Sequence, residues 1–151
     1  MDVLRIIHAH NKFLILTVLL ASAVVLLSSA ARGKDFGKLQ RAFYAATHGF
    51  IGLQVVLGLV LIFSLGFSQP YRIEHMSIML LAFGLMHLPL RWKRETGPDR
   101  VRKTGLVVSA TLILVIVGIL RLPFAFFGVP GNGKPAEGQN PLAPAASPSQ
   151  P

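Results

Sequence analysis

Residues 13–31, FLILTVLLASAVVLLSSAA, form a run of nineteen residues without a charged side chain. An α-helix rises about 1.5 Å per residue and the hydrocarbon core of a bilayer is about 30 Å thick, so roughly 20 apolar residues span it. Three further apolar runs reach this length, at 42–67, 73–92 and 105–127. None of them shows the period-2 alternation of β-barrel strands. The sequence therefore predicts an all-α integral membrane protein of four transmembrane helices.

The composition agrees with a lipid bilayer as the surrounding medium. Of the 151 residues 52% are hydrophobic and only 14% are charged, and the mean hydropathy is +0.59; about 25% charged residues is usual in soluble domains. The net charge of +9 does not indicate a nucleic-acid partner, because such a partner requires a basic patch on a soluble fold. Instead, ten of the fifteen Lys and Arg residues lie in two short segments at the ends of apolar runs: Arg32, Lys34, Lys38, Arg41, Arg91, Lys93, Arg94, Arg100, Arg102 and Lys103.

These basic segments predict the orientation of the chain. They follow the first and third apolar runs, whereas the connection between the second and third runs carries one positive residue, Arg72. Basic loops remain in the cytoplasm. We therefore expect a multi-pass protein of the bacterial inner membrane with both termini outside. Short connections between successive helices predict an up-down-up-down four-helix bundle.

The two ends of the chain raise separate questions. The small residues 28–31 could form the cleavage site of a signal peptide, but Arg32 and Lys34 directly after them favour a retained first helix. We place the transmembrane domain at 1–128. The Pro/Ala-rich segment 129–151 is too poor in apolar residues to offset the entropy of ordering, so we expect a disordered tail.

Five histidines carry the capacity for cofactor chemistry, since the chain has no cysteine. The topology sorts them by depth into an outer group, with His8 or His10 before the first helix opposite His75, and an inner group of His48 and His87. A low-spin b-type haem takes two axial imidazoles from facing helices. The pattern predicts one or two haems b, whose iron would be ligated by these pairs.

The spacing of the histidines on the third helix has two consequences. His75 and His87 are twelve residues apart, which gives about 18 Å of rise and suits one haem per leaflet. The same spacing leaves their side chains roughly 120° apart around the helix, which counts against two haems. An alternative is that these are interfacial histidines, for which a polar ring near the headgroups costs little.

Two other polar residues lie within or near the apolar runs. Arg121 could bind haem propionates, extend to lipid headgroups or neutralise Glu74. Gln54 lies deep in the second helix, where we expect a helix–helix hydrogen bond.

The stretch His8-Ala9-His10-Asn11-Lys12-Phe13 resembles the opening of a group of small four-helix bacterial membrane proteins labelled cytochrome-b-like. Similar elements are Gln54…Leu57-Gly58-Leu59 in the second run and Glu74-His75…Met79…Ala82…His87 in the third. The layout is also similar to one four-helix half of haem A synthase. The resemblance extends to about residue 125 and implies His75 and His87 as the first ligand candidates, with His10 next. His48 is a departure from the group's pattern.

Together these features predict a b-type haem protein in transmembrane electron transfer. A membrane quinol or a periplasmic protein would donate the electrons, and the chain could serve as a subunit of a larger respiratory or photosynthetic complex. Little of the chain lies outside the bilayer, so an electron-transfer subunit is favoured over a stand-alone enzyme. The alternatives are a structural or assembly subunit without a cofactor and a small haem or metal transport protein.

Overall fold

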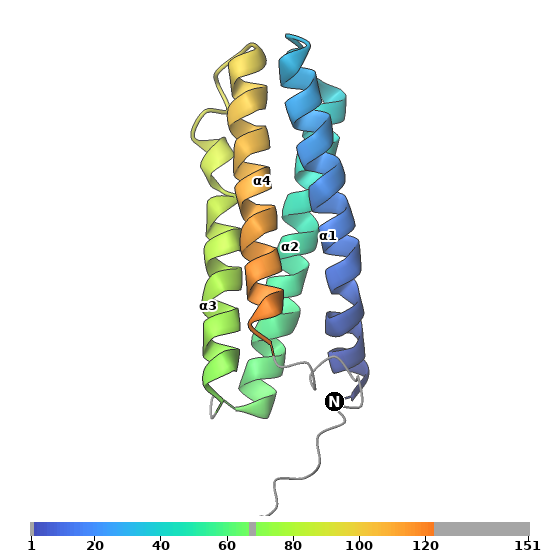
Figure 1. Cartoon of the computed structure of the whole chain (residues 1–151), viewed down its shortest axis with the longest axis vertical. Helices are drawn as coiled ribbons and strands as arrows, with labels where there is room; N and C mark the ends of the chain where they lie inside the picture. The colour runs from blue at the N-terminus through green and yellow to red at the C-terminus, as the bar shows by residue number, and fades with distance from the viewer. Residues whose placement is uncertain (1, 67–68, 123–151) are drawn as a thin grey trace, which may run out of the picture.

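The computed structural model describes residues 2–66 and 69–122, and these form a bundle of long helices (Figure 1). The elements are α1 (Asp2–Ala31), α2 (Lys38–Leu65), α3 (Pro70–Leu85), the short 3-10 helix η1 (Leu88–Leu90) and α4 (Pro98–Leu120). Within the described ranges there is no strand. The all-α prediction is confirmed.

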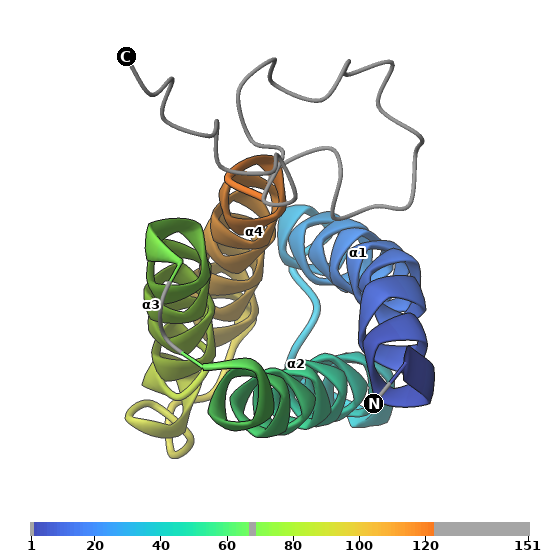
Figure 2. The same ribbon diagram turned by 90° about the horizontal axis from the view of Figure 1, so that it is seen from below.

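Figure 2 shows the bundle from one end, with α1 beside α2 and α4, and α3 beside the same two helices. α1 and α3 therefore lie opposite one another. Successive helices run antiparallel, and α1 begins at the same end of the bundle at which α4 finishes (Figure 1). The predicted up-down-up-down bundle is confirmed.

All four long helical segments have the length and apolar composition to cross a bilayer. Large apolar side chains cover the outside of the bundle, among them Phe63 at 74% and Leu120 at 73% exposure. A continuous apolar exterior of this kind is stable in lipid, where helices satisfy their backbone hydrogen bonds internally. The chain is thus a multi-pass membrane protein.

The helices begin earlier than the apolar runs that predicted them. α1 starts at Asp2 rather than at residue 13, α2 at Lys38 rather than 42, and α4 at Pro98 rather than 105. Helical hydrogen bonding continues through polar residues until a breaker stops it, and Gly97 with φ +88° is such a breaker. The predicted helix ends at 67 and 127 and the tail 129–151 lie outside the described residues.

α3 ends early for a different reason. The apolar run predicted a helix to residue 92, but α3 ends at Leu85. Pro89 has no N–H to donate, and its ring would collide with the Leu85 carbonyl in a continuing α-helix. The chain instead turns through Met86 and His87 into η1. The residues after Leu85 therefore do not follow the rotation of α3.

The interior combines apolar packing with a few polar contacts between helices. Leu19, Leu26, Ile51 and Val108 are fully buried within one core cluster. Between α1 and α2, the hydroxyl oxygens of Ser22 and Thr47 are 2.6 Å apart, and Gln40 Nε2 donates to Ser29 Oγ at 2.9 Å. Such side-chain hydrogen bonds hold helices together where lipid removes the hydrophobic driving force.

Candidate functional site

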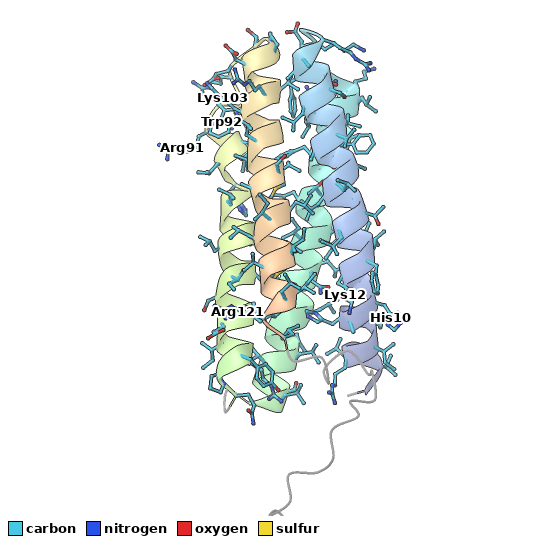
Figure 3. The ribbon with its side chains drawn as sticks, in the orientation of Figure 1. His10, Lys12, Arg91, Trp92, Lys103 and Arg121 are labelled. Atoms are coloured by element: carbon cyan, nitrogen blue, oxygen red, sulfur yellow. The ribbon has the colours of Figure 1, made fainter. Side chains whose placement is uncertain are left out.

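His8 lies on the second turn of α1, inside the helix rather than before it. Two residues correspond to about 200° of rotation, so His8 and His10 cannot face the same side. His8 is buried, at 9% exposure, whereas His10 is exposed and its Nδ1–H donates to Ile6 O within α1 at 2.8 Å. Figure 3 shows His10 on the side of α1 away from the other helices. Of the two candidates left open by the sequence, the structure brings His8 to His75.

His75 faces His8 across the bundle. The ring centroids are 6.4 Å apart and the ring planes are inclined by 81°. His75 Nδ1 is 2.8 Å from the carbonyl oxygen of Gly118 on α4. A carbonyl oxygen only accepts, so Nδ1 carries the proton and the neutral ring keeps a lone pair on Nε2. Metal-ligating histidines commonly make such a hydrogen bond through the ring nitrogen that does not bind the metal, and this bond orients the ring.

Gln54 on α2 holds His8 in place. Its Nε2 donates to the His8 carbonyl oxygen at 3.0 Å and lies 3.4 Å from His8 Nε2, while its Oε1 accepts from Asn11 Nδ2 at 2.8 Å. The expected helix–helix hydrogen bond of Gln54 is confirmed. The other ring nitrogen, His8 Nδ1, is buried and has no hydrogen-bond partner among the described residues. An unpaired buried polar group costs about 1–3 kcal/mol.

A cavity opens beside this pair, with a volume of about 680 Å³ including the part open to the surroundings. Its wall is mainly apolar and comes largely from α2 and α3. Gly58 leaves room beside His8, and Gly118 lies at ordinary contact distance from His75. A Cβ atom at Gly58 would lie 3.2 Å from His8 Cε1, and one at Gly118 would lie 3.7 Å from His75 Nδ1.

Arg72 also lines the cavity, and the sequence alone did not indicate it as a site residue. Its Nη1 donates to the carbonyl oxygens of Leu65 and Gly66 at 2.8 and 3.2 Å. Its Nε is buried and has no hydrogen-bond partner in the described part of the chain. In the sequence, Arg72 is a single cation next to an apolar run, and the charge pattern assigned it to the connection between two helices. In the structure it places a buried donor where an acidic group could enter.

Arg121 is not among the described residues that line the cavity. Its Nε lies 3.9 Å from Glu74 Oε2, and both side chains are more than half exposed, at 63% and 55%. Of the three roles considered from the sequence, the structure shows the neutralisation of Glu74. Exposed ion pairs of this kind contribute about 0–1 kcal/mol.

The second histidine pair lies toward the opposite end of the bundle. His48 Nε2 on α2 is 3.3 Å from His87 Nε2, and the ring centroids are 4.6 Å apart. His87 Nδ1–H donates to the Phe83 carbonyl oxygen at 2.9 Å, and the Phe83 ring packs against both imidazoles. The predicted partners are therefore adjacent, but their rings are in direct contact, which leaves no space for a porphyrin between them.

The fold and these two sites describe a multi-pass membrane protein with a histidine pair near each end of its bundle. Comparison of the chain with protein-family models, with curated proteins and with solved structures finds no match. The function must therefore be inferred from the geometry of the two pairs. The resemblance to cytochrome-b-like proteins stays a prediction.

Proposed function

We propose that the chain binds one b-type haem beside this cavity, where His8 and His75 would hold its iron. The observation that carries this proposal is the 6.4 Å separation of their ring centroids across the bundle. Metal–imidazole bonds are about 2 Å long, so two imidazoles on opposite sides of one iron have centroids about 6 Å apart. The two histidines come from opposite helices, α1 and α3.

The remaining cavity residues fit such a group. Gly58 provides space next to His8, and Gln54 orients His8. The unpaired Nε of Arg72 is a donor suited to a propionate carboxylate, since Arg binds carboxylates through charge-assisted hydrogen bonds. The haem would supply reversible one-electron chemistry. The residues of the chain hold it, orient its ligands and exclude water with an apolar wall.

The inner pair does not support a second haem. His48 Nε2 and His87 Nε2 are only 3.3 Å apart, whereas two axial nitrogens on one iron are about 4 Å apart with a macrocycle between them. We therefore propose one haem per chain, near the end of the bundle where α1 and α3 begin.

This location supports an electron-transfer role at one face of the bacterial inner membrane. Ten of the basic residues lie in the connections and the adjoining helix turns at the other end of the bundle, so the positive-inside rule favours a haem on the outer side, with both termini outside. A membrane quinol is a suitable donor, and a second membrane protein a suitable acceptor. The competing proposal, a structural subunit without a cofactor, interprets His8 and His75 as interfacial polar residues.

Absorption spectra of purified variants test the haem proposal. Protein produced with ample haem should show a Soret band at one haem per chain. His8→Ala and His75→Ala should each abolish the low-spin spectrum, because each removes an axial ligand. His10→Ala is the matched control and should keep the spectrum, as should His87→Ala. A wild-type protein without a Soret band, or a spectrum lost in His10→Ala and kept in His8→Ala, would contradict the proposal.

A further inference from the structure

The proposed haem site leaves the inner pair, His48 and His87, without a role. His48 lies ten residues from the start of α2, about 15 Å along the axis, near the end of the bundle that carries the basic loops. His87 lies just beyond α3 and is exposed, while His48 is half-buried. The pair is thus accessible from the bundle surface. Two imidazoles from separate elements meet there with their Nε2 atoms facing each other.

The separation of these atoms is informative. Hydrogen bonds donated by N–H groups are typically 2.7–3.2 Å long, so 3.3 Å makes a long and weak one. Two imidazole nitrogens that bind one tetrahedral ion at about 2.0–2.1 Å each are about 3.3–3.4 Å apart. The observed distance between His48 Nε2 and His87 Nε2 therefore matches the distance between two ligand nitrogens of a tetrahedral metal site.

The surroundings hold the rings in this arrangement. The Phe83 carbonyl accepts from His87 Nδ1–H, which leaves the Nε2 lone pair of His87 directed at His48. A metal-binding histidine commonly makes this kind of contact through its other nitrogen. The Phe83 ring contacts both imidazoles, with centroid distances of 5.5 Å to His48 and 4.7 Å to His87. The pair is consequently positioned before any ion arrives.

We propose that His48 and His87 bind a tetrahedral transition-metal ion of the Zn²⁺ class. The ion takes the position of the proton that His48 Nε2 shares with His87 Nε2, and that same proton moves to His48 Nδ1, so that both imidazoles bind as neutral ligands. Among the described residues no third His, Cys, Asp or Glu completes a metal group here. The other two positions are therefore taken by water or by an exchangeable ligand. This makes an open site, in contrast to the closed sites of structural zinc.

Titration of the purified full-length protein with Zn²⁺, in detergent without chelators, tests the site. One Zn²⁺ should bind per chain in the wild type. His48→Ala and His87→Ala should each raise the Kd by at least about tenfold, because each removes one of two protein ligands. Co²⁺ should give the intense visible absorption of a tetrahedral ion in the wild type and lose it in both variants.

Two controls separate this site from the others. His10→Ala removes an exposed histidine whose ring bonds to Ile6 within α1, far from the inner pair, and it should leave Zn²⁺ binding unchanged. His75→Ala should lose haem and still bind Zn²⁺, so failure of the haem proposal does not affect this one. His87→Gln keeps the side-chain size and should weaken Zn²⁺ binding like His87→Ala. Equal Zn²⁺ binding in the wild type and both inner variants, or none in the wild type, would overturn the proposal.

Discussion

At the scale of single residues, two glycines contact the outer histidines, and one of them, Gly58, determines how much space His8 has. Gly58 on α2 lies against the edge of the His8 ring, and Gly118 on α4 lies beside His75 and accepts its hydrogen bond. Glycine in a helix interior is less favourable than alanine by roughly 0.5–1 kcal/mol. At Gly58 the absence of a side chain leaves the space beside His8 that the cavity requires.

Substitution of Gly58 tests this use. Gly58→Val should lower haem affinity, since its Cβ would meet His8 Cε1 at 3.2 Å and its methyl groups would enter the cavity. Overpacking of this kind costs about 1–3 kcal/mol, equivalent to about 5- to 150-fold in affinity. Haem titration followed by the Soret band measures the change. Gly49→Val on the same helix is the control, because a Cβ there meets nothing within 4 Å. Equal haem affinities in the two variants would remove Gly58 from the site.

At the scale of elements, the end of α3 determines where the inner pair meets. Pro89 stops the helix, which leaves the last carbonyl groups of α3 without helical partners. Met86 is the residue that follows α3. The Tyr44 hydroxyl on α2 donates to its carbonyl oxygen at 2.6 Å and so satisfies this acceptor. The same contact fixes the turn that carries His87 toward α2. The end of α3 before Pro89 and the hydrogen bond from Tyr44 to Met86 together bring His87 next to His48.

Tyr44→Phe should therefore lower the stability of the protein. The substitution keeps the ring and leaves the Met86 carbonyl without its donor, which costs about 1–3 kcal/mol in free energy of unfolding. Denaturation in a defined detergent, followed by circular dichroism, measures the loss. Tyr71→Phe is the matched control, because the Tyr71 hydroxyl makes no hydrogen bond within the described ranges 2–66 and 69–122. A stability loss of the same size in Tyr71→Phe would show that the Met86 contact contributes nothing.

The elements also show what the sequence could and could not predict. Apolar run length predicted four helices, and helix count alone predicted which histidines share a membrane depth. The choice between His8 and His10 needed the true start of α1, which polar residues hide from a hydropathy pattern. The 120° offset between His75 and His87 assumed one continuous helix, and Pro89 removes that assumption. The role of Arg72 depends on burial, which a lone charge in a sequence does not reveal.

At the scale of the whole molecule, the two ends of the bundle differ in the number of basic residues that they carry. Figure 3 shows Arg91, Trp92 and Lys103 near one end and His10 and Arg121 near the other. Exposed basic residues close to helix ends are retained on the cytoplasmic side, where anionic lipids also attract them. From this difference we predict that His48 and His87 lie toward the cytoplasmic face and His8 and His75 toward the opposite face.

Reporter fusions test this orientation directly. A reporter active only in the periplasm should give signal when fused after Gly133 and none when inserted within 95–100, because the latter segment lies among the basic residues. A reporter active only in the cytoplasm, fused at the same two positions, should give the reciprocal result and controls for expression. The reverse pattern would put His48 and His87 on the outer side and the proposed haem on the inner side. The pairing itself would remain, because it rests on contacts within the bundle and not on its direction in the membrane.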